Sequence, residues 1–202
     1  MMEDEGQREL QHRMKNMAAV IRCLARRSVA TSDNLEEFQT RFDGRVGALV
    51  RAHIARSRNE AAGPDLEEIL RDTLQEHAPG AGNWSVAGPE VQLPGSLGDI
   101  LALLFHELAV EALLGGGLAD EGLSEPGGRL EVEWGVEPGD RPHLRLDWRE
   151  TGRAERRTVI GSRLARELLD TALPRQCQGR AEEAAEPDGL RLRLNIPLGE
   201  AG

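Results

Sequence analysis

The chain has 202 residues and a net charge of -10, with 30% charged and only 3% aromatic residues. Nucleic-acid binding calls for basic patches and stacking rings, so this balance argues against such a partner. No apolar run approaches the ~20 residues that a membrane-spanning helix needs, and the acidic start is unlike a signal peptide. Cys23 and Cys177 fit no metal-binding spacing. We therefore expect a cytoplasmic protein of one or two domains.

The N-terminal part of the chain predicts two long helices. Over residues 5–28 the apolar side chains recur at spacings of four and three, at Leu10, Met14, Met17, Ile21 and Leu24. Residues 31–34 break this helix, and a second apolar series predicts another helix to about Arg56. Two such helices form an antiparallel hairpin. The hairpin buries its apolar faces either by pairing with a second copy as a four-helix bundle or by packing on its own C-terminal domain.

Residues 61–202 predict a mixed domain, which makes the whole chain α+β. Asp65 is the expected N-cap of a short helix, and a longer apolar helix follows over residues 97–114. A further helix is expected from Gly161 to about Leu173. Alternating patterns predict strands at residues 84–86, 91–93, 129–134, 143–148 and 190–196. Residues 174–188 are polar and are expected to form a mobile loop.

His12 has an unusual setting on the first predicted helix. It lies off the apolar series, so we expect it to face solvent. Arg13, Lys15 and Asn16 place two cations and an amide beside it, and Lys15 is the only lysine of the chain. This setting suits an imidazole that accepts a phosphoryl group, although an ordinary surface histidine fits the same position.

Four stretches of the sequence together resemble the HWE histidine kinases. The run His12-Arg13-Met14-Lys15-Asn16 is similar to the H box of that family, His-Arg-x-Lys-Asn. The second stretch, Phe105-His106-Glu107-Leu108-Ala109-Val110-Glu111-Ala112, resembles the N box. The third, Trp148-Arg149-Glu150-Thr151-Gly152, resembles the Trp-x-Glu motif, and the fourth, Gly161-Ser162-Arg163-Leu164, resembles the end of the ATP lid.

The resemblance covers nearly the whole chain, in order. It implies a dimerisation and phosphotransfer hairpin at residues 1–60, followed by a Bergerat-type ATPase-like α/β sandwich at residues 61–202. It also implies that His12 is the phosphoacceptor, assisted by Arg13, Lys15 and Asn16, and that response-regulator receiver domains are partners. The nucleotide-site positions of the family fall on His106, Glu107, Glu111, Trp148, Glu150, Gly152 and Gly161. Without the resemblance, the same residues fit packed core groups or partners of arginines.

Several departures from the family pattern fall on nucleotide contacts. Glu111 stands where the family has the asparagine that holds the magnesium of Mg-ATP, and it adds negative charge beside the phosphates. Leu114 and Gly115 replace a Lys-Tyr pair, while Arg153 and Val159 replace glycines. We therefore expect a weakened nucleotide pocket and no bound cofactor. Mg-ATP, with Glu111 as metal ligand, belongs to the kinase alternative.

The sequence alone favours a histidine phosphotransferase. An intact H box, a weakened pocket and no evident sensor segment point to relay of a phosphoryl group through His12 between receiver aspartates. The first alternative is an active HWE histidine kinase that autophosphorylates His12 from ATP. The second is a pseudokinase that acts as a binding module. The expected assembly is a homodimer.

Overall fold

A computed structural model describes residues 2–58, 63–79, 83–115, 118, 128–152 and 160–199. The chain divides into two units, Met1–Gly47 and Ala48–Gly202. The domain boundary predicted at residue 60 falls within 59–62, outside the described residues, and stays a prediction. Among the described helices, none combines the length and the apolar character that crossing a membrane requires.

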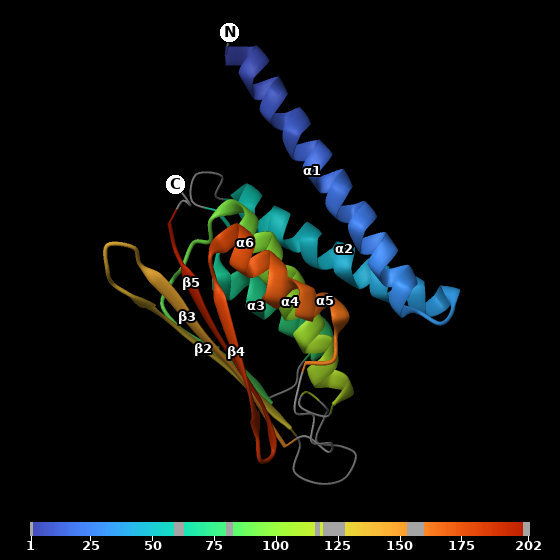
Figure 1. The fold of residues 1–202 in the computed structure, drawn as a ribbon, viewed down its shortest axis with the longest axis vertical. Coiled ribbons are helices and arrows are strands. Elements are labelled where there is room, and N and C mark those ends of the chain that lie inside the picture. The colour runs from blue at the N-terminus through green and yellow to red at the C-terminus, as the bar shows by residue number, and fades with distance from the viewer. Residues whose placement is uncertain are drawn as a thin grey trace. The chain divides into compact units, whose positions relative to one another are not determined.

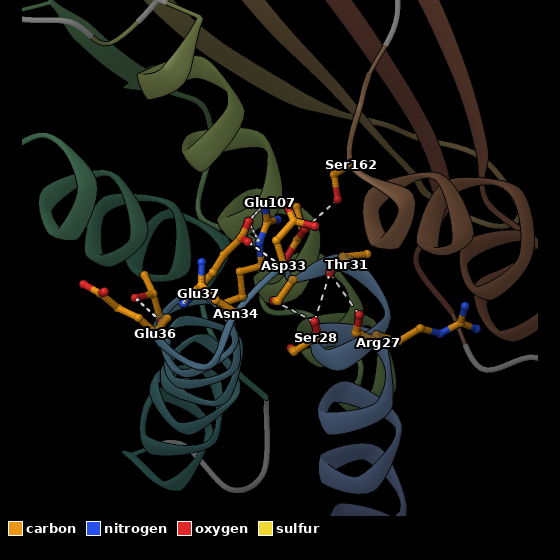
Figure 2. A network of polar contacts seen from close by, with 12 residues as sticks. Arg27, Ser28, Thr31, Asp33, Asn34, Glu36, Glu37, Glu107 and Ser162 are labelled. Atoms are coloured by element: carbon orange, nitrogen blue, oxygen red, sulfur yellow. Dashed lines mark hydrogen bonds and ion pairs between the residues drawn. The ribbon is translucent and has the colours of Figure 1, made fainter.

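The first unit contains helix α1 (Met2–Thr31) and the start of α2 (Leu35–Arg58). Side chains define the turn between them: Thr31 donates its hydroxyl to the Arg27 carbonyl at 2.9 Å, and Asn34 accepts from the Glu37 amide at 2.9 Å (Figure 2). This is N-capping of α2 by the asparagine. Both predicted helices are confirmed. The four-helix bundle in a dimer stays a prediction.

The two helices of this unit are joined by a buried polar contact. The Arg45 guanidinium of α2 donates to the Ser28 hydroxyl of α1 at 2.9 Å. Ser28 is 0% and Arg45 2% exposed. Because a buried charge is costly without hydrogen bonds, this contact fixes which faces of α1 and α2 meet near the turn.

The second unit is built on one five-stranded sheet with the order β1-β2-β3-β5-β4 (Figure 1). The strands are β1 (Trp84–Ala87), β2 (Arg129–Glu137), β3 (His143–Thr151), β4 (Arg180–Glu186) and β5 (Gly189–Pro197). β1 runs parallel to β2, and the other neighbours are antiparallel. The sheet is therefore mixed, as the α+β class predicts.

Helices cover one face of this sheet (Figure 1). They are α3 (Leu66–His77), α4 (Gly95–Leu114) and a continuous helical segment made of α5 (Arg163–Glu167), a π-helical turn (Leu168–Ala172) and α6 (Leu173–Cys177). Asp65 caps α3 by accepting from the Glu68 amide at 3.0 Å, as its position in the sequence predicts.

The core lies between the helices and the sheet. Every second residue of the central strands points into it, as in the row of Val132, Trp148 and Leu192, which pair across three strands and are all 0% exposed. Each such side chain contributes roughly 1.5–3 kcal/mol through burial. The opposite sheet face carries charged residues, among them Asp147 and Arg191, whose side chains pair at 2.6 Å.

Two sequence-based predictions are wrong. Residues 174–188 form most of α6 and the edge strand β4 rather than a mobile loop. β4 consists of one arginine, three alanines and three glutamates without a regular apolar alternation, and it exposes most of its side chains, so its polarity hid its strand character. Residues 91–93 form no strand; Gln92 makes only an isolated bridge to Asp65.

Candidate functional site

α4 carries three polar side chains that are almost fully buried. His106 is 4%, Glu107 6% and Glu111 7% exposed. Since Glu107 and Glu111 are four residues apart, both carboxylates lie on the same side of the helix. His106 is turned by about 100° from Glu107 around the helix axis. The helix therefore presents two carboxylates to one neighbour and an imidazole to another.

The two carboxylates hold the residues that lead into α5. The Ser162 hydroxyl donates to Oε2 of Glu107 at 2.5 Å (Figure 2). The Gly161 amide donates to Oε2 of Glu111 at 3.1 Å. Ser162 also caps α5, because its oxygen accepts from the Ala165 amide at 3.1 Å. Two motifs thus meet through direct hydrogen bonds between residues that are 50 and 55 positions apart in sequence.

Ile160, the residue before Gly161, is held by hydrogen bonds to β4 and α5 rather than to α4. The Ile160 amide donates to the Glu183 carboxylate of β4, and the Ile160 carbonyl accepts from Nε of Arg166 at 3.1 Å. Arg166 also pairs with Glu183 at 2.7 Å. The stretch 160–162 is therefore anchored to α4, to α5 and to the sheet edge.

Trp148 and Glu150 of β3 form a buried polar pair. Both are 0% exposed, and Nε1 of Trp148 donates to Oε1 of Glu150 at 2.8 Å. Glu150 lies in register between Leu130 and Leu190, where an unbonded carboxylate would be costly. Phe105 of α4 stacks on Trp148 with a centroid separation of 6.1 Å. These contacts place the Trp-x-Glu pair in the core beneath α4.

The structure describes only some of the positions at which the sequence departs from the family pattern. Gly152, just after β3, has φ +70°, a left-handed conformation that favours glycine. Arg153 and Val159 fall within residues 153–159, outside the described part of the chain. Leu114, where the family pattern has a lysine, ends α4 and is 74% exposed, and Gly115 follows as its cap.

His106 faces α3 rather than α5. Its Nδ1 lies 3.1 Å from Nε2 of His77, at the end of α3, and the two rings are tilted by 50°. Glu76 is the third polar group here, with its Oε2 4.0 Å from the same nitrogen of His77. Burial lowers the pKa of His77, although the Glu76 charge opposes this. Burial therefore favours the neutral form of the His77 imidazole.

The predicted phosphoacceptor lies within α1. The backbone at His12 is helical, but the side chains of His12 and Arg13 are outside the described part of the structure. Lys15 and Asn16 are exposed, and Met14 is 65% exposed. The proposed roles of this group stay predictions.

The sequence-predicted site residues thus fall into three places in the described part of the chain. Glu107, Glu111 and Gly161 come together; Trp148 and Glu150 form a pair on β3; His106 lies with His77. Sequence reasoning missed three partners, which are His77, Arg166 and Glu183. These three residues carry no recognisable sequence signal. Ser162, by contrast, could be recognised from the sequence, because a serine before a helical pattern is typical of an N-cap.

The known proteins that this chain resembles in sequence are histidine kinases. A family model described as HWE histidine kinase matches residues 9–90. A blue-light-activated histidine kinase of Rhizobium johnstonii is 29% identical over 190 residues, covering 94% of this chain and 52% of that protein. One of Brucella abortus is 26% identical over 193 residues, covering 95% and 38%. The chain spans about half the length of these relatives, or less.

Solved structures agree in fold. The histidine kinase domain of the Erythrobacter litoralis EL346 blue-light activated histidine kinase has a TM-score of 0.63 at 18% identity, covering 94% of this chain and 89% of that one. The longer EL346 structure has a TM-score of 0.60 at 20% identity, covering 96% and 59%. At such identities the likeness establishes the fold alone, helices followed by a mixed five-stranded sheet.

Proposed function

The chain belongs to the HWE histidine kinase family, and on this premise we propose that it is the kinase module of a two-component system. In this proposal His12 takes the γ-phosphoryl group of ATP and passes it to an aspartate of a response-regulator receiver domain. The names of the relatives favour this reading over the phosphotransferase expected from the sequence. A cytoplasmic location is part of the same proposal.

The proposed chemistry runs in two transfers. A ring nitrogen of His12 attacks the γ-phosphorus, the bond to the bridging oxygen breaks, ADP leaves, and the displaced imidazole proton goes to solvent. Arg13 and Lys15 would neutralise the transferring group, and Asn16 would donate a hydrogen bond. In the second transfer the receiver carboxylate attacks the phosphohistidine, which regenerates His12.

The observation that carries the proposal is the junction between α4 and residues 161–162. Two buried carboxylates, Glu107 and Glu111, face this end of the predicted ATP lid. Carboxylate oxygens are the ligands that Mg²⁺ prefers, so this donor set fits the metal of Mg-ATP. In the proposed complex Glu111 would hold the magnesium, and Glu107 would keep Ser162 in place.

The same junction favours a second candidate, the histidine phosphotransferase. Glu111 already engages the Gly161 amide at 3.1 Å, and a second negative charge lies one turn away on α4. Two carboxylates repel a triphosphate unless a cation intervenes. In that case His12 would receive its phosphoryl group from a receiver domain, and no nucleotide would be needed.

Labelling of the full chain distinguishes the two functions. The chain is incubated with γ-labelled Mg-ATP in one arm and with a phosphorylated receiver domain in the other. The kinase proposal predicts acid-labile, alkali-stable label from ATP. The label should be lost in His12→Ala and kept in His143→Ala, the control, since His143 lies on β3 and bonds Asn195 at 2.7 Å. Lys15→Ala should slow labelling about 10²-fold.

Each outcome decides something. Label from the receiver alone would replace the kinase with the phosphotransferase. Label from ATP that survives in His12→Ala would contradict both proposals. Label from neither source would leave the chain as a binding module, the second alternative from the sequence.

The assembly we propose is a homodimer through the first unit. Met14, Val29 and Leu35 are apolar yet 65%, 64% and 69% exposed, and Val20 is 36% exposed. Such side chains on two successive helices provide the apolar surface that a bundle would cover. Sedimentation velocity at tens of micromolar should give twice the chain mass. A monomer under these conditions would rule out this assembly.

A further inference from the structure

We propose that Glu76, His77 and His106 form a site for a zinc ion, which ties the end of α3 to the middle of α4. The three side chains each offer one ligand atom, and these atoms all lie within 4.8 Å of one another. The cluster lies on the side of α4 that faces α3, away from the contacts that Glu107 and Glu111 make with residues 161–162. It therefore stands independently of the proposed kinase function.

The two imidazoles already have the spacing of zinc ligands. Nε2 of His77 and Nδ1 of His106 are 3.1 Å apart. Two nitrogens bound to one tetrahedral Zn²⁺ at 2.0–2.1 Å lie about 3.3 Å from each other. The rings thus need to separate only slightly to admit the ion, and both come from helices of at least twelve residues.

Glu76 supplies the third ligand. Its Oε2 lies 4.0 Å from Nε2 of His77, and its side chain is 38% exposed. A small rotamer change brings the carboxylate to the ion, and the open side leaves the fourth position to water. His₂Glu with water is an established zinc ligand set. Mg²⁺ prefers oxygen ligands, so this site discriminates against it.

Zinc binding changes the position of one imidazole proton and leaves both rings neutral. In the hydrogen-bonded pair one imidazole donates to the other; when zinc binds, both facing nitrogens give their lone pairs to the metal. The ring that had donated the hydrogen bond transfers its proton, through exchange with solvent, to its far nitrogen. Both rings are then neutral, with the proton on Nδ1 in His77 and on Nε2 in His106. Burial lowers the pKa of His77, which supports the neutral ring that a metal requires.

One cation competes with zinc. The Arg51 guanidinium of α2 forms an ion pair with the same Oε2 of Glu76 that faces His77. Zinc has to displace this guanidinium and overcome its charge. Removal of the Arg51 charge should therefore strengthen metal binding, which a purely structural role of the histidine pair does not predict.

The test is calorimetry of the tag-free full chain with zinc chloride, in the presence of excess Mg²⁺. The wild-type chain should bind one Zn²⁺. His77→Gln and Glu76→Gln should each bind at least about tenfold more weakly, since even an indirect partner of a metal ligand contributes about 10–100-fold. Arg51→Gln should bind several-fold more tightly. His143→Gln, which changes a histidine on β3, is the matched control and should bind as the wild type does.

Cobalt provides a readout of geometry. Co²⁺ added to the wild-type chain should give the visible absorption of a tetrahedral site, and His77→Gln should lack it. Circular dichroism of each variant verifies that it is folded. The proposal is overturned if folded His77→Gln binds zinc like the wild type, if Mg²⁺ displaces the zinc, or if Arg51→Gln weakens binding.

Discussion

Replacing Gly189 with alanine should destabilise the second unit strongly. A Cβ at this position would lie 1.7 Å from the Glu150 carbonyl oxygen and 2.6 Å from its carbon, whereas real Cβ atoms stay beyond 3.0 Å. Both obstacles are backbone atoms, so β5 and β3 would have to separate by more than an ångström where Glu150 pairs with Leu190. Overpacking of this kind costs about 1–3 kcal/mol, and the rigid neighbour favours the upper end.

The assay is urea unfolding followed by tryptophan fluorescence. Trp84, Trp134 and Trp148 are the only tryptophans and all lie in the second unit, so the signal reports this unit alone. Gly135→Ala is the matched control, because a Cβ there meets nothing within 4 Å. It should be neutral or stabilising by up to about 1 kcal/mol. Equal stability of the two variants would refute the packing of β5 against Glu150.

Three further changes have expected outcomes. Ser162→Ala removes the hydrogen bond to Glu107 and the cap of α5, and should cost about 1–3 kcal/mol in the same unfolding assay. Burial raises the pKa of Asp147, but hydrogen bonds and charges from Arg191 and Arg193 lower it by a larger amount. The net pKa of Asp147 is therefore below its ordinary value. The resulting stabilisation is present above the unfolded-state pKa of about 3.9 and is lost as pH falls through the native value; Asp147→Asn should remove this pH dependence. In the first unit, Phe42→Ala should weaken the proposed dimer by roughly 1.5–3 kcal/mol, measured by sedimentation equilibrium.

The sequence predicted the elements whose apolar periodicity is strong. α4 and the central strands each bury a continuous apolar face, and this face is what periodicity reports. β4 was missed because an edge strand contacts one neighbour only and needs few apolar side chains. In β4 the Glu183 carboxylate accepts a hydrogen bond from the Ile160 amide, and no local sequence pattern predicts this contact.

Orientation of site residues was harder to predict than their presence. The N-box resemblance grouped His106 with Glu107, yet adjacent helical residues point about 100° apart. His106 therefore meets His77, and Glu107 meets Ser162. Which neighbour lies on each side of α4 depends on the packing of α3 and α5, and this long-range information is absent from a short motif.

If the chain binds a nucleotide, the charge of Glu111 should make that binding depend on a metal ion. Two unit charges 4 Å apart interact by about 4 kcal/mol at an effective dielectric constant of 20, and the sign is unfavourable between this carboxylate and a phosphate. A Mg²⁺ ion between them reverses the sign. If the chain is a kinase, calorimetry should detect ATP only with Mg²⁺ present, whereas Glu111→Asn should retain measurable binding in EDTA. Glu111 is 7% exposed and accepts from Gly161, so the asparagine, which also offers an oxygen acceptor, should fold normally. Binding of metal-free ATP by the wild-type chain would show that this carboxylate does not face the phosphates.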